Sequence, residues 1–286
     1  MTNQKKILFL GDIVGRPGRN AVNHYLNNIE FYLNFKPDFI IANCENASHG
    51  FGLTEKNYTE LIASGIDLLT SGNHIWDRKE VFDYIDDAER LIRPLNYPKK
   101  TPGKGSIVVK RDGFSIGVIN LLGRVFMDPF DSPWDLITQE VQKMQLETPN
   151  IIVDFHAEAT AEKIAFGYCL AELGVTAMIG THTHVQTADE AILDGVLAYI
   201  TDVGACAVTR SVIGMDINTS LKRLSTLLPV RYEIPSLDEV TLCGVVLTID
   251  VTTGIPVSIN RVKQQIDLKN LPVEDKLDDN NEDVID

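Results

Sequence analysis

The sequence predicts one α/β domain in which mixed, mostly parallel sheets are flanked by helices. Short apolar runs alternate with segments of helical periodicity through the first half of the chain, as in units of strand, helix and parallel strand. Later apolar runs lie close together, and Arg-Asp-Gly at 111–113 is a hairpin signal, so antiparallel strands are added. The chain has 286 residues, of which 44% are hydrophobic, which is enough for the core of such a domain.

The elements of the first half are identified by apolar runs for strands and by apolar residues three and four positions apart for helices. Thr54 is the expected N-cap of one helix, and Gly65 lies just beyond the end of that helix. The expected order is a strand at 6–10, a loop with Gly and Pro at 15–18, a helix at about 20–33, a strand at 38–43, a helix at 54–63, a strand at 66–70, a helix at 78–85 and a short strand at 91–93.

The second half is expected to hold more strands than helices. Neither an internal repeat nor a linker interrupts it, so residues 1–273 are expected to form a single domain. The expected elements are strands at 106–110 and 114–122, a helix at 134–146, a strand at 150–155, a helix ending at 173, and strands at 175–179, 191–201, 240–251 and 257–262.

The end of the chain differs in composition from the rest. Residues 274–286 hold seven acidic residues, one lysine and few apolar residues, which predicts a disordered acidic tail. The formal net charge of the whole chain is −14. Because binding along extended nucleic acid requires a basic face, no extended nucleic acid is expected as a partner.

The apolar runs are too short to cross a membrane, since a spanning helix needs about 20 apolar residues. Residues 1–6 contain two lysines but lack the apolar stretch and cleavage site of a signal peptide. The cysteines form no CxxC pair, which indicates reduced thiols. We therefore expect a cytoplasmic protein with no membrane partner. The four cysteines are Cys44, Cys169, Cys206 and Cys243.

Polar side chains gather at the ends of the predicted strands, where open α/β sheets bind ligands. Taken singly, each has an ordinary role: Asp12 as a turn or cap residue, Asn73 as a turn former, His156 as a hydrogen-bonded structural histidine. Of the six histidines, only His24 lies within a predicted helix. The polar residues at the strand ends are Asp12, Glu45, Asn46, Asn73, His74, His156, His182 and His184.

As a set, these residues predict a metal site. His182 and His184 are two positions apart, so in an extended segment both imidazoles point to the same side. Imidazole, carboxylate and amide donors suit Mn, Fe, Zn or Co rather than a metal that requires thiolates. Apart from His74, the set offers seven ligands, which exceed what one ion with an open position needs and fit two ions that share a bridging carboxylate. The alternative is that the histidines are structural and bind no metal.

The order of these motifs resembles that of a known superfamily. The series Gly11-Asp12, Asn43 to Asn46, Gly72 to His74, Phe155-His156 and Gly180 to His184 resembles the calcineurin-like metallophosphoesterases, and most of all their bacterial YmdB-type branch. The resemblance extends from residue 6 to about residue 265. It implies the layered α/β fold of that superfamily, with mixed, mostly parallel sheets flanked by helices.

The sequence departs from the broad superfamily pattern at three places. Ile13 and Val14 follow Asp12, so the histidine of an Asp-x-His motif is missing. Glu45 stands where the superfamily usually has a bridging aspartate, and Ile75 follows His74 where an acid is usual. In the branch, Asn46 replaces the missing histidine. Because an amide oxygen is a weaker donor than imidazole, the first ion is expected to be the more labile one.

The resemblance also implies the ligand sets and the mechanism. The expected cofactors are two divalent or trivalent ions, Fe or Mn first, with Zn, Co and Mg also compatible. A hydroxide that bridges the ions attacks phosphorus, and His74 donates a proton to the leaving oxygen. The implied ligands are Asp12, Glu45, Asn46 and His184 for the first ion, and Glu45, Asn73, His156 and His182 for the second.

Three further residues are candidates for substrate binding. Arg16 and Arg19 follow Asp12 and could hold a phosphate with a planar guanidinium fork, or they could be solvated loop residues. His49 lies in the loop Ala47–Gly52 and is expected to face the substrate rather than a metal. The glycines near Arg16 match neither the P-loop nor the dinucleotide-binding motif, which argues against both functions.

These observations together predict a metal-dependent phosphodiesterase. The resemblance points to 2′,3′-cyclic, and secondly 3′,5′-cyclic, nucleoside monophosphates. Two bound cations would make the site locally positive, so an acidic chain is compatible with a small anionic substrate. The alternatives are a phosphomonoesterase or nucleotidase with the same metals, and a metal-stabilised scaffold that binds a nucleotide and signals to a partner. Strands after residue 190 could supply an edge for a homo-oligomer.

Overall fold

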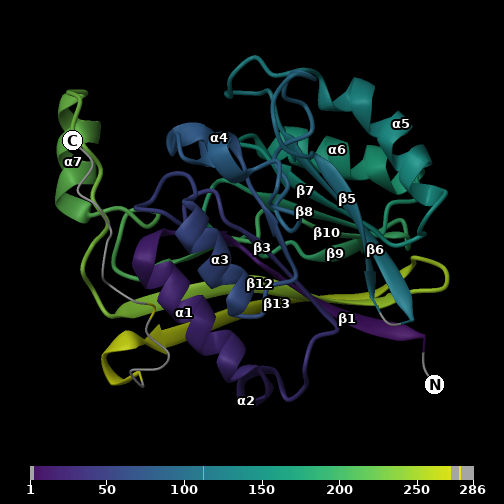
Figure 1. The fold of residues 1–286 in the computed structure, drawn as a ribbon, viewed down its shortest axis with the longest axis horizontal. Coiled ribbons are helices and arrows are strands. Elements are labelled where there is room, and N and C mark those ends of the chain that lie inside the picture. Colours follow the sequence, from purple (N-terminus) through teal and green to yellow (C-terminus); the bar gives the residue numbers. More distant parts are fainter. Residues whose placement is uncertain (1–2, 112, 272–276, 278–286) are drawn as a thin grey trace.

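The computed structural model describes residues 3–111, 113–271 and 277, and its strands form two sheets packed face to face (Figure 1). The strands of the first sheet are β1 (Gln4–Leu10), β2 (Asp12–Ile13), β3 (Phe39–Asn43), β4 (Leu68–Thr70), β11 (Ala205–Val208), β12 (Glu239–Asp250) and β13 (Pro256–Asp267). Their order across the sheet is β2, β11, β12, β1, β3, β4, and β13 pairs with β12.

The second sheet has the order β5, β6, β7, β8, β10, β9. Parallel pairs join β1 to β3 to β4, β2 to β11, and β6 to β7 to β8 to β10, whereas the remaining pairs are antiparallel. Both sheets are therefore mixed, as predicted. The strands of the second sheet are β5 (Ser106–Arg111), β6 (Phe114–Leu122), β7 (Ile151–His156), β8 (Ala177–Thr181), β9 (Ala191–Leu193) and β10 (Leu197–Ile200).

Helices cover the outer face of each sheet. Figure 1 shows α1 and α3 over the first sheet, α5 and α6 beside the second, and α7 standing apart from both. The described residues contain no helix long and apolar enough to span a bilayer. The helices are α1 (Gly15–Asn27), α2 (Ile29–Leu33), α3 (Glu55–Ala63), α4 (Val81–Tyr84), α5 (Pro133–Gln145), α6 (Thr160–Glu172) and α7 (Ile217–Thr226), with the 3₁₀ turns η1 (Asn73–Asp77) and η2 (Leu268–Asn270).

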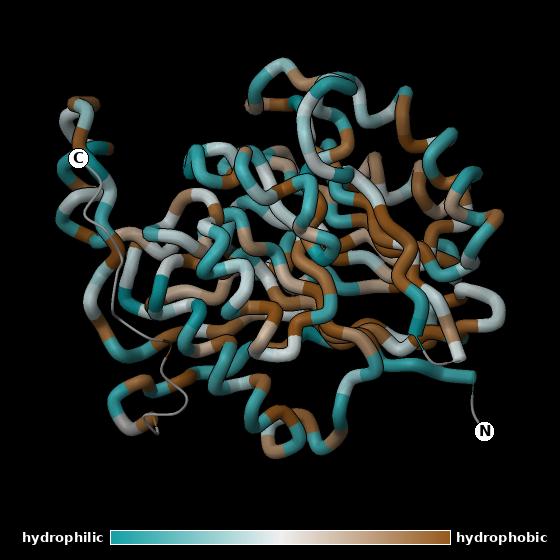
Figure 2. Tube along the Cα trace, in the orientation of Figure 1, coloured by the Kyte–Doolittle hydropathy of each residue, from teal (hydrophilic) through white to brown (hydrophobic). Residues whose placement is uncertain are grey.

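The core has three layers, because each sheet buries both of its faces. Between the sheets, alternate residues of β1 and β12 such as Phe9 and Val245 meet Ile152 and Ile179 of the second sheet. A second layer packs the first sheet against α1 and α3, and a third packs the other sheet against α5 and α6. The hydrophobic residues accordingly concentrate along the strands in the middle of the molecule (Figure 2).

Most predicted elements are present, and Thr54 caps α3 by accepting a hydrogen bond from the backbone N–H of Asn57. The predicted loop at 15–18 is wrong, because α1 already begins at Gly15 and tolerates a proline in its first turn. The predicted helix at 20–33 is divided at Asn28 into α1 and α2.

Further differences lie beyond residue 90. The predicted strand 191–201 is a hairpin of β9 and β10, since Asp194 and Gly195 have the positive φ of a tight turn. Residues 91–93 form only isolated bridges, and β2, β11 and α7 were not predicted. The predicted acidic tail, 274–286, lies outside the described residues except for Leu277.

The parallel strands place their carboxyl ends along one edge of the molecule. β3 and β4 of the first sheet and β7 and β8 of the second end there. Hydrogen bonds join the two sheets at this edge, where the Asn43 side-chain amide donates to Asp154 at 3.0 Å. The backbone N–H of Ser71 also donates across it to Asn120 at 3.2 Å. The edge is therefore held rigidly where the polar side chains emerge.

Candidate metal centre

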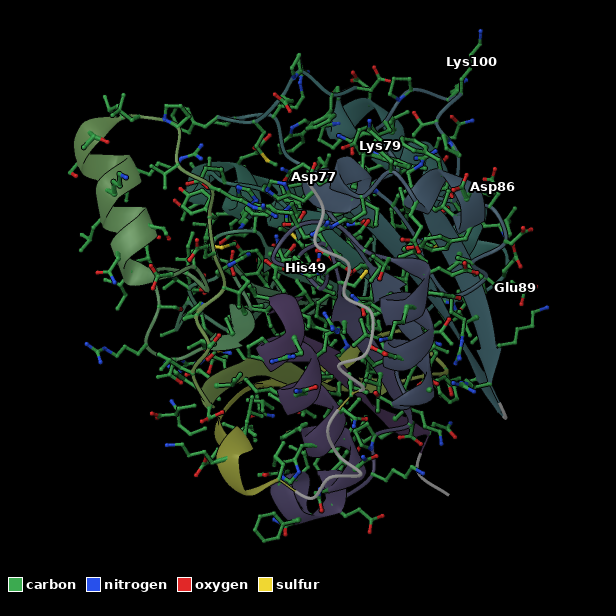
Figure 3. All side chains as sticks on the ribbon, turned by 60° about the vertical axis from the view of Figure 1, so that its left-hand side comes forward. His49, Asp77, Lys79, Asp86, Glu89 and Lys100 are labelled. Carbon is green, nitrogen blue, oxygen red and sulfur yellow. The ribbon has the colours of Figure 1, made fainter. Side chains whose placement is uncertain are left out.

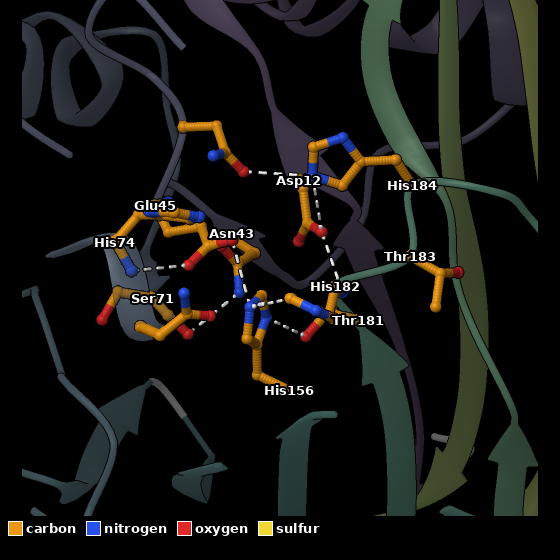
Figure 4. Close-up of polar contacts among 12 residues, drawn as sticks. Asp12, Asn43, Glu45, Ser71, His74, His156, Thr181, His182, Thr183 and His184 are labelled. Atoms are coloured by element: carbon orange, nitrogen blue, oxygen red, sulfur yellow. Dashed lines mark hydrogen bonds and ion pairs between the residues drawn. The ribbon is translucent and has the colours of Figure 1, made fainter. Parts of the chain in front are cut away.

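Five of the seven predicted metal ligands, Asp12, Glu45, His156, His182 and His184, come together at this edge, from both sheets (Figure 4). Asp12 belongs to β2, His156 is the last residue of β7, and Asn73 is the first of η1. The others follow strands directly, because each strand ends where its side chains can leave the core. Those that follow β3 are Glu45 and Asn46, and those that follow β8 are His182 and His184.

One group of candidate ligands joins the two sheets through Glu45. The Nε2 atom of His156 lies 3.0 Å from Oε1 of Glu45 and 3.0 Å from Nδ1 of His182. One potential donor atom from each of these three residues lies within 4.8 Å of the other two. Two imidazoles and a carboxylate at this separation suit a transition-metal ion.

A second group forms around Asp12 and shares Glu45 with the first. Asp12, Glu45 and His184 again present donor atoms within 4.8 Å of one another. The Nε2 atom of His184 lies 3.4 Å from Oδ2 of Asp12 and 3.1 Å from Oδ1 of Asn46. The arrangement can therefore accommodate two cations with a common carboxylate.

Each of the three histidines uses one ring nitrogen to contact a partner outside the site. This contact turns the other ring nitrogen toward the two groups of candidate ligands. Nδ1 of His156 lies 2.8 Å from the hydroxyl of Thr181, which itself donates to Asp154. Nε2 of His182 lies 3.2 Å from the Glu158 carboxylate. Nδ1 of His184 donates to the carbonyl of Ile213 at 2.8 Å. Such outer partners fix the tautomer and orientation of metal-binding histidines.

Two buried oxygens within the site have no hydrogen-bond partner among the described residues. They are Oδ1 of Asp12 and Oδ1 of Asn73. Leaving a buried polar atom unsatisfied costs about 1–3 kcal/mol, and more when the group is charged. Both atoms belong to predicted ligands, so the residues present fit bound cations.

The pKa values show how closely the charges are packed. Burial raises the pKa of Asp12 well above its usual range, and the neighbouring Glu45 raises it further. Burial alone would also raise the pKa of Glu45, but the charge and the hydrogen bond of His156, together with the charges of the neighbouring histidines, outweigh it and hold the pKa below its usual range. Burial and the charge of His156 lower the pKa of His182 to about 3, which leaves a neutral imidazole. Buried carboxylates beside a neutral imidazole are the surroundings that a cation prefers.

The backbone lies close to the candidate ligands at Gly72, and it is strained at His182 and His184. A Cβ atom on Gly72 would collide with Glu45 and His156, so only glycine fits there. His182 and His184 have φ values of +100° and +63°. The prediction that they lie in an extended segment is therefore wrong. They reach different groups of ligands through a turned backbone, which is costly for residues with a side chain.

His74 lies beside the ligands without joining either group. Its backbone N–H donates to Oε2 of Glu45 at 3.1 Å, and its Nδ1 lies 2.8 Å from the carboxylate of Asp77. The ring of Phe51 contacts its edge, with centroids 4.9 Å apart. The sequence suggested no acid beside His74, because Ile75 follows it, but the 3₁₀ turn brings Asp77, three positions later, to that place.

The three predicted substrate-binding residues lie elsewhere. Arg19 is buried in α1, where it donates to the carbonyl of Ala47 and faces Glu60. Arg16 and His49 line a small cavity closed by Ile234, separate from the one beside the histidines. The structure thus does not bring these three side chains to the ligand groups.

Sequence reasoning missed the partners that orient the ligands. Glu158 and Asp77 are ordinary surface acids in the sequence, and the Ile213 carbonyl carries no side-chain signal. The motif Phe-His-Ala-Glu at 155–158 could have suggested Glu158, because it places an acid two residues after a ligand.

The sequence is similar to proteins of one family. Residues 8–262 match the family model described as YmdB-like protein. A 2′,3′-cyclic-nucleotide 2′-phosphodiesterase of Bacillus subtilis (strain 168) is 49% identical over 257 residues, which cover 90% of this chain and 96% of the relative.

Solved structures show the same architecture. A hypothetical protein from Thermus thermophilus has a TM-score of 0.84 at 36% identity, covering 91% of this chain and 99% of that chain. A novel phosphatase from Mycoplasma pneumoniae has a TM-score of 0.85 at 34% identity, covering 93% of this chain and 95% of that one.

Proposed function

The chain belongs to the YmdB-like family, and on that premise we propose that it is a metal-dependent phosphodiesterase for 2′,3′-cyclic nucleoside monophosphates. Cyclic 3′,5′ nucleotides are the second candidate substrate. The B. subtilis relative is named for the first of these reactions, and 96% of its length aligns with this chain. The reaction class is hydrolysis of a phosphoric ester.

The observation that carries the proposal is the orientation of three histidines around one shared carboxylate. His156, His182 and His184 each engage an outer partner with one nitrogen and turn the other toward Glu45 or Asp12. A structural histidine needs one hydrogen bond, and nothing in the core requires three such rings to converge. Their convergence favours metal binding over the purely structural alternative.

We assign the ligands as the family resemblance implies. Glu45 would be shared by two ions, for which we propose Fe or Mn, with Zn, Co or Mg as alternatives. When bound, two such ions lower the pKa of a shared water and offset the charge of the phosphoryl oxygens. Asp12, Glu45, Asn46 and His184 would hold the first ion, and Glu45, Asn73, His156 and His182 would hold the second.

The chain's own residues supply the proton and its orientation. Asp77 accepts a hydrogen bond from Nδ1 of His74, so Nε2 of that ring is directed away from Asp77. A protonated His74 donates from Nε2 to the ester oxygen as it leaves, and Asp77 stabilises the imidazolium before that transfer. The backbone bond from His74 to Glu45 keeps the donor beside the ligand groups.

Metal analysis combined with substrate assays tests the proposal. Protein purified without added ions should hold up to two of Mn, Fe, Zn or Co per chain, and should open 2′,3′-cyclic AMP. Less than about one ion per chain, with no activity regained on adding Mn²⁺, would reject the metal site. His156→Ala should lose metal and activity, whereas the matched control His24→Ala on α1 should keep both.

Two other functions predict different results in the same assays. Release of phosphate from simple monoesters, without opening of cyclic nucleotides, would identify a phosphomonoesterase or nucleotidase, and the M. pneumoniae neighbour is described as a phosphatase. A regulatory scaffold would bind nucleotide with no turnover, and folded His74→Ala would behave as the wild type does.

Location and assembly remain predictions from the sequence. We propose a cytoplasmic protein whose residues 1–273 act as one domain and which forms a homo-oligomer. Fractionation of cells and sedimentation of the purified chain test these points.

A further inference from the structure

A cavity of about 680 Å³ lies beside the candidate metal centre. On one side it is lined by Glu45, Asn46, His74, His182 and His184. On the other it is lined by residues of a segment that we call the arm, residues 209–236, which contains α7. The helix α7 of the arm stands apart from the sheets in both views of the ribbon (Figures 1 and 3), and the volume of the cavity is typical of a small-molecule site.

The root of the arm, which contains Ile213, Met215 and Asp216, contacts the candidate metal centre. The tip of the arm, which contains α7, is not packed on the sheets. Met215 packs in a small cluster with Val14 and Phe51, and the N–H of Asp216 donates to the Glu233 carbonyl at 2.8 Å. The carbonyl of Ile213 orients His184. The tip exposes Leu221 and Leu224 of α7, and Leu227 and Leu228 just after the helix. The position of the cavity wall is thus set by contacts with the site itself.

The rings of Phe51 and Tyr232 form an aromatic wall of the cavity, next to the proposed proton donor His74. The ring of Phe51 contacts His74 at 4.9 Å, and the ring of Tyr232 lies 6.3 Å from that of Phe51 at an angle of 35°. The guanidinium of Arg223 lies 4.6 Å from the centroid of Tyr232, which fixes this ring through a cation–π contact. Phe51, Tyr232 and Arg223 all line the cavity.

The charges around the cavity favour an anion. Of the three carboxylates on the body side, Asp77 and Glu158 are already engaged by His74 and His182, and Glu45 belongs to the candidate metal ligands. Arg223 and Arg231 lie on the arm side. A ligand with a negative end for the metal centre and a flat apolar end for the aromatic wall matches both sides of the cavity.

We infer that this cavity is a nucleoside-binding subsite, in which the base of the substrate rests against the wall of Phe51 and Tyr232. The inference depends on the proposed function, because the phosphodiester must lie at the metal centre for the base to reach the wall. The arm then determines specificity: it selects phosphodiesters that carry a heteroaromatic base. Stacking of a base on an aromatic side chain is sequence-tolerant, so all four bases should be accepted.

The test compares two substrates that share a reacting ring. One is 2′,3′-cyclic AMP, and the other is glycerol 1,2-cyclic phosphate, which has the same five-membered cyclic ester and no base. Tyr232→Ala should lower kcat/KM for the nucleotide by about 5- to 150-fold, as expected for one lost stacking contact. It should leave kcat/KM for the glycerol ester within about twofold, since the metal centre is unchanged.

Two control variants identify the cause of any loss. Tyr232→Phe keeps the ring and should keep the preference for the nucleotide. Tyr168→Ala removes a tyrosine from α6, outside the cavity lining, and should change neither substrate. An equal loss for both substrates in Tyr232→Ala, or no loss for either, overturns the subsite.

A binding measurement separates this inference from the proposed function. Adenosine carries the base without a phosphate, and calorimetry should detect it with the wild type and much more weakly with Tyr232→Ala. If the wild type opens neither cyclic ester, the proposed function fails, and adenosine binding then decides the subsite alone. If the wild type opens both esters equally well and binds no adenosine, the subsite is rejected while the proposed function stands.

Discussion

Replacing Lys163 with methionine should destabilise the protein more than any change to a surface lysine. Lys163 lies in α6 and is fully buried, with Nζ 2.8 Å from Oδ2 of Asp202 and 2.7 Å from the carbonyl of Thr181. Methionine fills similar space but leaves Asp202 as a buried charge without a cation, and it leaves the Thr181 carbonyl without this donor. Asp202 keeps hydrogen bonds from the N–H groups of Thr183 and Gly204.

The expected cost follows from that uncompensated charge. Removing one partner of a buried ion pair costs about 3–5 kcal/mol, out of a total stability of about 5–15 kcal/mol. The corresponding fall in Tm is roughly 6–20 °C. Thr181 and Thr183 flank His182, so the variant should also hold less metal than the wild type.

Urea and thermal unfolding followed by circular dichroism provide the assay, and Lys143→Met provides the control. Lys143 is 69% exposed and pairs with Glu140 at 3.2 Å on the surface. Its replacement should therefore change the free energy of unfolding by no more than about 0.5 kcal/mol. The double variant Lys163→Met with Asp202→Asn should recover part of the loss, because no charge is left unpaired. A loss of unfolding free energy in Lys163→Met no larger than that in Lys143→Met would refute this explanation. So would a double variant whose loss of unfolding free energy equals the losses of its two single changes added together.

Three further predictions concern the ligands, the proton donor and the thiols. Gly72→Ala places a methyl group against Glu45 and His156, so the variant should lose metal and its kcat/KM should fall by about 100-fold or more, while its circular dichroism stays unchanged. A variant with full metal content would contradict this prediction. Asp77→Asn should keep its metal but lower kcat by about 10- to 100-fold, because the outer partner of His74 is lost; an unchanged pH–rate profile would count against that role. Burial raises the pKa of Cys243 to about 11, so the folded state keeps a proton that the unfolded thiol releases above about pH 8.5. Stability should therefore fall as the pH rises from about 9 to 11, and urea titrations at pH 8 and 10 should show a smaller fall in Cys243→Ala than in the wild type.

The sequence by itself determined most of the strands and the residues that follow them. A run such as residues 6–10 is apolar at nearly every position, which is typical of a strand buried on both faces, and β1 has that place. Polar residues after such strands must lie at the carboxyl edge of the sheet. For this reason Glu45, His156 and His184 could be grouped without coordinates.

Only the tertiary structure decided what surrounds those residues. Asp77 and the Ile213 carbonyl orient two of the histidines, yet nothing in their local sequence distinguishes them from other surface groups. The arm likewise lies beside the candidate metal centre through contacts between residues far apart in the chain, such as Tyr232 with Phe51.

The physical reason is the range of the interactions involved. Strand formation and residue order depend on local patterns of apolar and polar side chains, which the sequence displays directly. The positive φ of His182 and the start of α1 at Gly15 depend instead on neighbours that only the complete fold supplies. The sequence therefore determined which chemistry the chain carries, and the packing of the two sheets and the arm decided how that chemistry is oriented and what it can bind.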